Sequence, residues 1–368
     1  MSKVKLRIQE NVPLAPLTTL KVGGPARYFV EVTDEIELSE ALTWARDKKI
    51  EVFAFGGGSN VVVNDAGFNG LVIKLNLKGI QGEERGNRAI LTVAAGESWD
   101  DVVAHAVEHG WGGIENLSGI PGSAGGAIVQ NVGAYGQTVA DTVHEVHAVE
   151  VATGQSTVFN RAACKFAYRD SYFKHEAHGR YILTKIVLQL TKNPAINLSF
   201  KGYRGSLADK LKGTPATLTS VRQAVLDTRG SMGYLLKDGY ERFQSVGSFF
   251  TNPVVPRSLF TQVEQTAKKL NPKKTAEPKP WHWDQPDGKV KLAAAFLIEF
   301  TDFKKGFKRG NVGISPKHNL SLITYPGATA AELVRLAREI QEAVLRIFTV
   351  KLSAEAQLVG FEPYPLLK

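Results

Sequence analysis

The chain has 368 residues, 43% of them hydrophobic, and a formal net charge of +9 at neutral pH. This length is sufficient for two or three domains, and the positive charge favours anionic partners such as nucleotides or phosphosugars. The single cysteine, Cys164, excludes an intrachain disulfide and is typical of a reducing compartment. Neither a signal peptide nor a run of about eighteen apolar residues is recognisable. We therefore expect a cytoplasmic protein without a membrane partner.

Strand-like and helix-like segments alternate in the first part of the chain. A helix is predicted after Asp34, because Asp34 and Glu37 have the spacing of a capping box. The short runs of β-branched and aromatic residues that predict strands here are at 28–32, 52–55, 61–63 and 71–73. The second of these runs directly into the first glycine loop, Gly56-Gly57-Gly58-Ser59-Asn60. A strand that ends in a glycine loop is where α/β folds hold a cofactor phosphate.

The middle of the chain is interpreted as a second α+β unit. A strand at 90–95 is followed by a helix that begins after Ser98 and ends at Gly110, since glycine commonly terminates helices. Further strands are predicted at 143–151, 156–159 and 181–190. Cys164 lies between the last two of these strands, and a lone cysteine in an apolar stretch is more often a core residue than a nucleophile.

The last third of the chain is interpreted as a separate unit. Residues 192–228 are a boundary region with a helix predicted at 219–228. The separate unit is 229–349, where helices are predicted at 290–299 and 329–348, the last with a Thr329/Glu332 capping box and a long apolar stripe. The lysine-rich segment 268–279 is interpreted as a solvated loop. The tail at 351–360 is predicted to be a strand with its one carboxylate in an apolar neighbourhood.

The second glycine loop, residues 118–136, is rich in glycine and contains no charged residue. Glycines at this density let the backbone approach a ligand closely, and successive backbone N–H groups form concave nests for anions. An ordered loop of this length inside a compact chain is usually functional. Together with the first glycine loop, it predicts a cradle for a diphosphate or a flat cofactor ring. The alternative interpretation is a long surface loop.

Three polar side chains are candidates for chemistry. Arg169 could clamp a carboxylate with two hydrogen bonds, or it could simply pair with the adjacent Asp170. Ser248 lies between a glycine and two aromatic residues, without the Gly-x-Ser-x-Gly elbow of a hydrolase. It could donate a proton if held away from water, or it could be a turn residue. Glu355 is either a buried general acid or a carboxylate at the rim of a site.

Several classes of function are not expected. The chain has no Gly-x-x-x-x-Gly-Lys-Ser/Thr loop, so a P-loop NTPase is disfavoured. No Gly-x-Gly-x-x-Gly motif opens a helix after a strand, so a Rossmann site is disfavoured as well. The eight histidines lack metal-ligand spacing, and no metal site is predicted. The basic residues are dispersed rather than interleaved with aromatics, so nucleic acid is not an expected partner.

Four motifs occur in a characteristic order and spacing. They are Gly56-Gly57-Gly58-Ser59-Asn60; Gly119-Ile120-Pro121-Gly122 with Asn131-Val132-Gly133-Ala134-Tyr135-Gly136; Tyr168-Arg169-Asp170-Ser171; and Gly247-Ser248-Phe249-Phe250-x-Asn252-Pro253. In these motifs the chain resembles the bacterial UDP-N-acetylenolpyruvoylglucosamine reductases of the first type. The similarity spans residues 18–360. Those flavoenzymes complete the synthesis of UDP-N-acetylmuramate for peptidoglycan.

The resemblance implies an α+β fold. Its parts would be a two-lobed FAD-binding module of the vanillyl-alcohol-oxidase (PCMH) type and an α/β substrate-binding domain. The expected boundaries are 1–79 for the first lobe, completed by 350–368, then 80–228 for the second lobe and 229–349 for the substrate-binding domain.

The resemblance also implies a reaction and the residues that carry it. NADPH would donate a hydride through FAD to the enol ether of the substrate. Arg169 would stabilise the enolate-like charge, Glu355 would act as hydrogen-bond donor or proton relay, and Ser248 would be the proton donor. The implied FAD contacts are Gly56, Gly57, Gly58, Ser59, Asn60, Gly119, Ile120, Pro121, Gly122, Ser123, Gly126, Ala127, Asn131, Gly133, Ala134 and Tyr135.

At two positions the chain departs from the family pattern. The tyrosine of the substrate loop is assigned to Tyr203, with Phe200 as the alternative register. The lysine that follows the arginine matching Arg229 is replaced here by Met232. Either Lys237 meets the diphosphate instead or the diphosphate is held by other groups, and Asn252 is favoured over Lys237 as a substrate contact. The predicted substrate contacts are therefore Tyr203, Lys237 and Asn252.

We therefore expect a monomeric, cytoplasmic enzyme that reduces a UDP-sugar enolpyruvyl ether. One alternative is another FAD oxidoreductase of the same fold, favoured if Arg169, Ser248 and Glu355 failed to converge. The other is a non-catalytic binder of nucleotides or nucleic acid, which would bind no flavin and would show a steep salt dependence.

Overall fold

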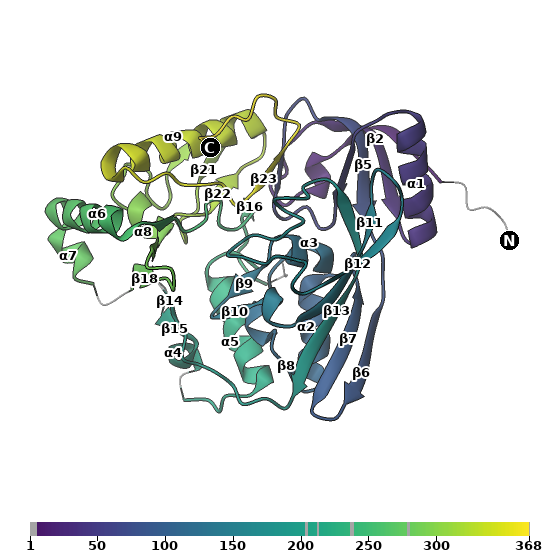
Figure 1. Ribbon diagram of the computed structural model, residues 1–368. Coiled ribbons are helices and arrows are strands. Elements are labelled where there is room, and N and C mark those ends of the chain that lie inside the picture. Colours follow the sequence, from purple (N-terminus) through teal and green to yellow (C-terminus); the bar gives the residue numbers. More distant parts are fainter. Residues whose placement is uncertain (1–5, 203–204, 212, 236–238, 278–279, 368) are drawn as a thin grey trace.

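The structure is a computed structural model that describes residues 6–202, 205–211, 213–235, 239–277 and 280–367. The predicted substrate contacts Tyr203 and Lys237 lie outside the described residues. In Figure 1 the amino-terminal elements lie at the upper right, a long twisted sheet with its helices fills the lower half, and the carboxyl-terminal elements lie at the upper left. The cavity described below is built from all three regions.

The amino-terminal sheet has four strands in the order β1-β2-β5-β3. Its strands are β1 (Gln9–Pro13), β2 (Pro25–Val32), β3 (Val52–Phe55) and β5 (Phe68–Leu75). Strands β2 and β3 both run parallel to β5. Helix α1 (Glu35–Asp47) packs its buried face on this sheet, and its predicted cap is confirmed, since Asp34 accepts the N–H of Glu37 at 2.8 Å.

The central sheet is antiparallel throughout, in the order β12-β11-β13-β7-β6, with β8 also paired to β13. Its strands are β6 (Ile80–Arg85), β7 (Arg88–Ala94), β8 (Trp111–Gly112), β11 (Val143–Glu150), β12 (Ser156–Asn160) and β13 (Tyr181–Lys192). Helix α2 (Trp99–Glu108) follows Ser98, as predicted. Cys164 is fully buried in this core, and burial raises the pKa of its thiol to about 12, so its interpretation as a core residue is confirmed.

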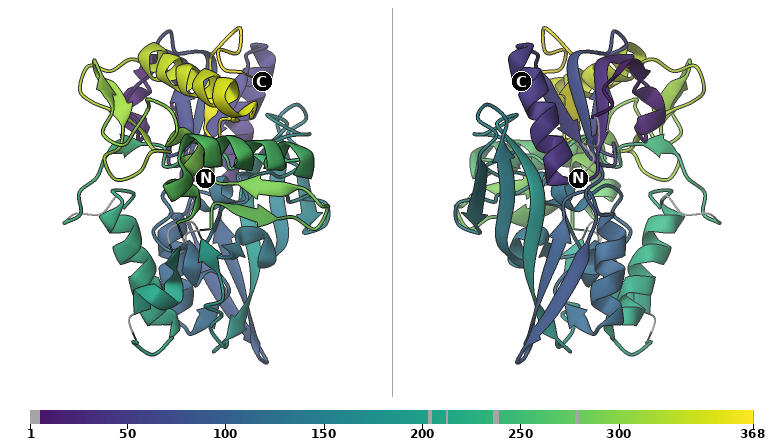
Figure 2. Two further views of the ribbon diagram at one scale, coloured as in Figure 1. Left: turned by 90° about the vertical axis from the view of Figure 1, so that its left-hand side faces the viewer. Right: turned by 90° about the vertical axis from the view of Figure 1, so that its right-hand side faces the viewer.

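The carboxyl-terminal region combines two small sheets with an amphipathic helix. The strands are β16 (Gln244–Ser245), β17 (Val254–Val255), β18 (His282–Asp284), β19 (Val290–Leu292), β20 (Lys308–Arg309), β21 (Val312–Ile314) and β22 (Leu322–Thr324). The helices are α6 (Arg257–Leu270), α7 (Pro272–Thr275), α8 (Ala294–Ile298) and α9 (Ala330–Phe348). Figure 2 shows α9 and α6 on the same side of the molecule.

Several short elements connect these regions. The strands among them are β4 (Val61–Val63), β9 (Gly133–Ala134), β10 (Gln137–Thr138), β14 (Lys201–Gly202), β15 (Gly205–Ser206) and β23 (Gln357–Val359). The helices are α3 (Ala124–Val129), α4 (Leu207–Leu211) and α5 (Leu218–Ser231), with 3-10 turns at Ala15–Leu17, Glu115–Leu117 and Val139–Asp141.

Two contacts join the end of the chain to its beginning. Strand β23 pairs in parallel with β4, so the tail returns to the amino-terminal region. The carboxylate of Asp65 accepts the N–H groups of Ala330 and Ala331 at 2.7 and 2.9 Å, at the start of α9. These contacts agree with an amino-terminal lobe that residues 350–368 complete, although the boundaries themselves stay a prediction.

Three expectations about secondary structure were wrong. A continuous helix at 290–299 is instead β19 followed by α8, because the chain at Val290–Leu292 pairs with β17 and β18. The lysine-rich segment contains the end of α6 and all of α7 rather than only loop. The tail forms a strand only at Gln357–Val359. Apolar runs fit helix or strand equally well when their hydrogen-bonding partners are unknown.

Among the described residues, no helix combines the length and apolar composition that a membrane span requires. Within the same residues, no group of three or more His, Cys, Asp and Glu side chains is placed to hold a metal ion.

Candidate functional site

One cavity of about 690 Å³ brings the predicted motifs together. Both glycine loops contribute to its wall, and the predicted catalytic residues Arg169, Ser248 and Glu355 all line it. These three residues come from the central region, the carboxyl-terminal region and the tail. Arg169, Ser248 and Glu355 therefore converge on one cavity, which is the arrangement that the reductase interpretation requires.

The two glycine loops touch through their backbones. A β-carbon at Gly57 would lie 2.8 Å from the α-carbon of Gly122, and one at Gly56 would overlap the hydroxyl of Ser123. The Ser59 hydroxyl donates to the Pro121 carbonyl at 3.0 Å and ties the loops together. Only glycine fits at this contact, so this part of the cavity wall is bare backbone.

A partly buried ion pair holds the start of the second glycine loop. Asp100 accepts the Gly119 N–H at 2.6 Å and pairs with Arg222 at 2.6 and 3.0 Å. Burial raises the pKa of Asp100, but the Arg222 guanidinium and the Gly119 N–H outweigh it and hold the pKa below its usual value. Arg229 donates to the Gly119 carbonyl at 2.9 Å. Gly119 is thus held on both sides and does not itself line the cavity.

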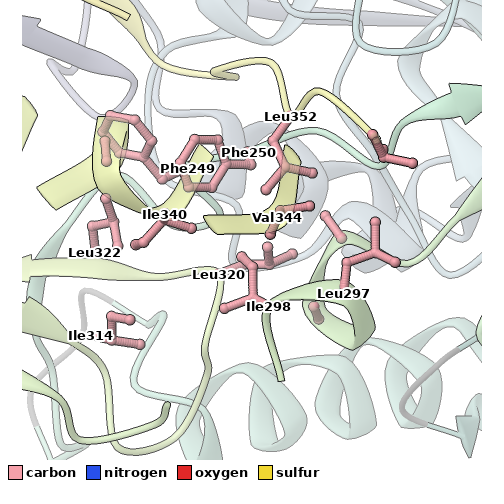
Figure 3. Packing of buried hydrophobic residues seen from close by; sticks show 14 of the residues in the cluster. Phe249, Phe250, Leu297, Ile298, Ile314, Leu320, Leu322, Ile340, Val344 and Leu352 are labelled. Atoms are coloured by element: carbon pink, nitrogen blue, oxygen red, sulfur yellow. The ribbon is translucent and has the colours of Figure 1, made fainter. Parts of the chain in front are cut away.

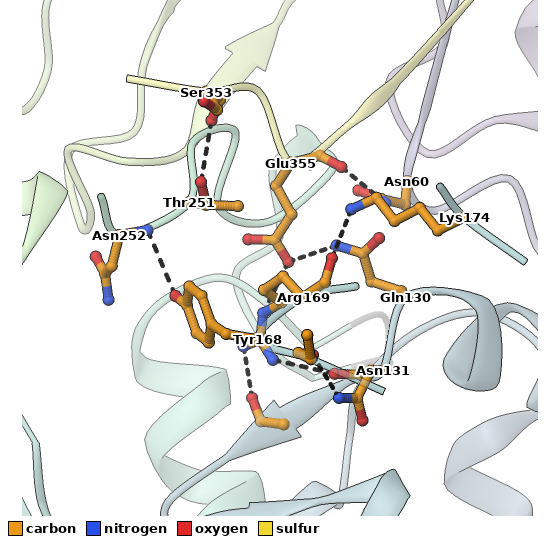
Figure 4. Close-up of polar contacts among 12 residues, drawn as sticks. Asn60, Gln130, Asn131, Tyr168, Arg169, Lys174, Thr251, Asn252, Ser353 and Glu355 are labelled. Carbon is orange, nitrogen blue, oxygen red and sulfur yellow. Dashed lines mark hydrogen bonds and ion pairs between the residues drawn. The ribbon is translucent and has the colours of Figure 1, made fainter. Parts of the chain in front are cut away.

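The Arg169 side chain contacts three groups of the site (Figure 4). Its Nε lies 3.0 Å from a carboxylate oxygen of Glu355. Its terminal nitrogens donate to the carbonyls of Gly133 at 2.6 Å and Asn131 at 3.5 Å. The backbone of Arg169 has a φ of +55°, in the left-handed region that arginine rarely adopts. The predicted local pair with Asp170 is not the contact that its guanidinium makes.

Glu355 is held by its side chain and by its backbone. The amide of Gln130 donates to the same carboxylate oxygen that Arg169 contacts, also at 3.0 Å. The Asn60 amide donates to the Glu355 carbonyl at 3.2 Å. The expectation of an apolar neighbourhood was therefore wrong, because the carboxylate lies between a guanidinium and an amide. Its side chain is only 16% exposed.

Ser248 precedes a segment that is anchored in the carboxyl-terminal core. Phe249 and Phe250 are buried, and Figure 3 shows both among apolar side chains that include Ile340 and Val344 of α9. Phe249 donates its N–H to the Leu320 carbonyl at 2.8 Å. Within the described part of the chain, the Ser248 hydroxyl makes no hydrogen bond, although it lines the cavity.

Some predicted contact residues lie behind the cavity wall. Asn131 donates to the Ala167 carbonyl at 2.6 Å and accepts the Ala140 N–H at 3.3 Å, so its amide joins two backbone segments. Asn252 accepts the Ala294 N–H at 3.0 Å. Neither side chain lines the cavity, and Tyr135 does not line it either.

Phe200, the alternative to Tyr203, packs over the hairpin of β9 and β10. A β-carbon at Gly136 would lie 3.0 Å from that of Phe200. Phe200 is not part of the cavity wall.

The site includes residues that were not among the predicted catalytic, cofactor or substrate contacts. Gln130, Lys174, Arg229 and Tyr234 line the cavity. Lys174 lies three residues after the motif Tyr168-Arg169-Asp170-Ser171, so its closeness to that motif was the available signal. Burial lowers the pKa of Lys174, and the nearby Glu355 carboxylate opposes this effect. Gln130 carried no such signal, because its role depends on a tail residue far away in the sequence.

Tyr168 connects the central region to the carboxyl-terminal region. Its hydroxyl accepts the Asn252 N–H at 3.4 Å, and the Lys291 ammonium lies 4.9 Å from its ring centroid. Burial raises the pKa of Tyr168 and lowers that of Lys291.

Comparisons with known proteins agree with this arrangement. A family described as "FAD binding domain" matches residues 26–160, and one described as "UDP-N-acetylenolpyruvoylglucosamine reductase, C-terminal domain" matches residues 238–359. A UDP-N-acetylenolpyruvoylglucosamine reductase from Thermobifida fusca is 40% identical over 355 residues, which cover 95% of this chain and 97% of that protein. One from Streptomyces coelicolor is 37% identical over 352 residues, covering 95% and 90%.

A solved structure shares the fold. The crystal structure of UDP-N-acetylenolpyruvylglucosamine reductase from Thermus caldophilus aligns with a TM-score of 0.64 at 23% identity, covering 96% of this chain and 99% of that one. The expected α+β fold class, an FAD-binding module followed by the reductase-type carboxyl-terminal domain, is confirmed.

Proposed function

Because the chain belongs to the family of UDP-N-acetylenolpyruvoylglucosamine reductases, we propose that it reduces UDP-N-acetylglucosamine enolpyruvate to UDP-N-acetylmuramate in peptidoglycan precursor synthesis. FAD is the cofactor, NADPH is the hydride source, and the cytoplasm is the proposed location of a monomeric enzyme. The observation that carries this proposal is the convergence of Arg169, Ser248 and Glu355 on the cavity that both glycine loops line.

The residues of the cavity fit a flavin dinucleotide. The wall at Gly56, Gly57 and Gly122 is bare backbone, where a β-carbon would collide, and a wall of backbone N–H groups suits a diphosphate without a side-chain cation. A volume of about 690 Å³ lies within the range of small-molecule sites. Bound FAD supplies hydride transfer, and its proposed contacts are those predicted glycine-loop residues that line the cavity, without Gly119, Asn131 and Tyr135.

The three predicted catalytic residues have distinct proposed roles. The guanidinium of Arg169 binds and stabilises negative charge that develops beside the substrate carboxylate. Glu355, held by Arg169 and Gln130, relays a proton or hydrogen-bonds the substrate. The Ser248 hydroxyl donates its proton to the substrate carbon next to the carboxylate. Serine is a weak acid, so this step relies on proximity to a strongly basic centre.

The substrate contacts stay proposals. Tyr203 is proposed to lie over the substrate, and Lys237 is proposed to meet its diphosphate. The Asn252 oxygen already binds the Ala294 N–H, so a substrate contact there would use the amide nitrogen. The net charge of +9 suits two anionic nucleotides that enter in turn.

An absorption experiment tests the proposal directly. The purified protein is expected to be yellow, to bleach with NADPH under anaerobic conditions, and to recolour when UDP-N-acetylglucosamine enolpyruvate is added. Bleaching without recolouring would reject the substrate and favour another FAD oxidoreductase of this fold. A colourless protein that takes up no FAD would reject the interpretation of both glycine loops.

A further inference from the structure

We propose that Lys174 is a positioning residue for Arg169: its ammonium holds the Arg169 backbone in the one conformation that aims the guanidinium at Glu355. This inference rests on the proposed function, because it concerns the residue that stabilises negative charge in that reaction. The inference assigns to Lys174 a role that it performs by binding the main chain of Arg169.

The turn that carries Arg169 is tight and strained. Ala167 and Asp170 exchange both backbone hydrogen bonds, at 3.0 and 3.1 Å, and Arg169 lies between them with a φ of +55°. Turn positions with positive φ favour glycine or asparagine, because a β-carbon crowds the backbone there. Arginine at this position needs external support, since the uncompensated backbone would relax toward negative φ.

Lys174 supplies that support from the same segment of chain. Its Nζ donates to the Arg169 carbonyl at 2.9 Å (Figure 4). Its own N–H bonds to the carbonyl and the hydroxyl of Ser171, and that hydroxyl donates to the Val129 carbonyl at 2.7 Å. The backbone of Lys174 is therefore anchored through Ser171 to the second glycine loop, and its ammonium binds the carbonyl of Arg169.

The direction of the guanidinium follows from the backbone. A change of φ at Arg169 swings its Cα–Cβ bond, so the contacts of its side chain with Glu355 at 3.0 Å and Gly133 at 2.6 Å could not both persist. Hydrogen bonds from a charged donor are stronger than neutral ones. The contacts of the guanidinium itself remain when Lys174 is replaced, so we expect a partial loss of alignment.

The test compares Lys174→Met with Lys165→Met by stopped-flow absorption. Lys165 lies in the same region, carries the same charge and pairs with Glu176 on the surface, but has no contact with Arg169. Lys174→Met should slow reoxidation by the enolpyruvyl nucleotide about 10- to 100-fold, through kcat more than KM, and should slow reduction by NADPH less than reoxidation. Lys165→Met should match the wild type in every measurement. Lys174→Arg, which keeps a charged donor, should recover part of the rate.

A double-mutant cycle separates positioning from a direct role. In an Arg169→Ala background, Lys174→Met should have no further effect, because the guanidinium that it positions is gone. An equal loss in both backgrounds would overturn the inference, since Lys174 would then act without Arg169. If the methionine variant does not fold, Lys174→Gln serves, with a smaller expected loss, and a wild-type rate would overturn the inference as well.

Failure of the proposed function gives a different result. A wild-type protein that is reduced by NADPH but not reoxidised by the nucleotide would reject the substrate. A wild-type protein that completes both half-reactions, together with a Lys174→Met variant of equal rate, would reject only the positioning role.

Discussion

The backbone N–H of Glu355 donates to the carbonyl of Phe249 at 2.7 Å. Phe249 follows Ser248 directly, and its own N–H is bonded to the Leu320 carbonyl at 2.8 Å. The positions of Ser248 and Glu355 relative to each other are therefore fixed by a backbone hydrogen bond at Phe249 rather than by a contact between their side chains. Substitution of either side chain should change the chemistry of the site while leaving the fold intact.

Ser248→Ala should separate the two half-reactions. Reduction by NADPH should remain nearly unchanged, because the hydroxyl makes no contact that positions the cavity wall in the described structure. Reoxidation by the enolpyruvyl nucleotide should slow at least about 100-fold, the usual contribution of a positioned proton donor. Rapid-mixing absorption of each half-reaction measures both rates. An equal loss in the two halves would remove the proton-donor role.

Gly57→Ala should prevent FAD binding. Its new β-carbon would lie 2.8 Å from the α-carbon of Gly122, so the two glycine loops would have to separate. Gly86→Ala is the matched control, because its position has a φ of +63° but open space around it. That variant should lose about 1 kcal/mol of stability and keep its flavin. FAD content after purification reports the difference, and a fully loaded Gly57→Ala would contradict the proposed cradle.

Asp100→Asn should destabilise the protein in a pH-dependent way. The folded-state pKa of Asp100 lies below its usual 3.8, so the charged form contributes stability above that value and loses it as the pH falls through the folded pKa. The ion pair with Arg222 is mostly buried, and we expect a loss of about 2 kcal/mol at neutral pH.

The measurement for Asp100 is urea unfolding of both proteins at about pH 7, about pH 5 and about pH 3. The difference in free energy of unfolding between wild type and variant should be similar at the two higher pH values and smaller at the lowest. A difference in free energy of unfolding that is the same at all three pH values would show that the charge of Asp100 does not stabilise the folded protein.

Cys164 should be unreactive in the native protein. Burial raises the pKa of its thiol to about 12, so the thiolate that reacts with alkylating reagents is scarce near neutral pH. Mass spectrometry after iodoacetamide treatment should detect no adduct in the folded state and one adduct in the denatured protein. Rapid native alkylation would mean that the central core opens around this residue.

Secondary structure was predicted best for elements whose own residues mark where they begin and end. Strands β3 and β4 were predicted with their bounds, because runs of β-branched and aromatic residues end at glycine or polar turns. The capping box of α9 fixed its start in the same way. Helix α6 was missed, because its narrow buried stripe of Phe260, Val263 and Ala267 is surrounded by polar residues.

Side-chain direction was harder to predict than the location of the site. Arg169 and Ser248 were predicted to lie at the site because the motifs that contain them are specific, and both line the cavity together with Glu355. Asn131 and Asn252 lie in equally polar motifs, yet their amides bond backbone groups behind the wall. A sequence shows that an amide is present but not whether it faces a ligand or a neighbouring segment, since that depends on contacts between distant parts of the chain.

The pairing of β23 with β4 has a consequence for biosynthesis. Glu355 precedes β23 near the end of the chain, and the strand that β23 joins lies near the beginning. On the ribosome, both glycine loops and Arg169 emerge long before the residue that Arg169 contacts. A nascent chain would therefore synthesise the residues of the cradle before Glu355, which completes the chemical centre. A protein cut short before β23 should be inactive, however well its earlier part folds.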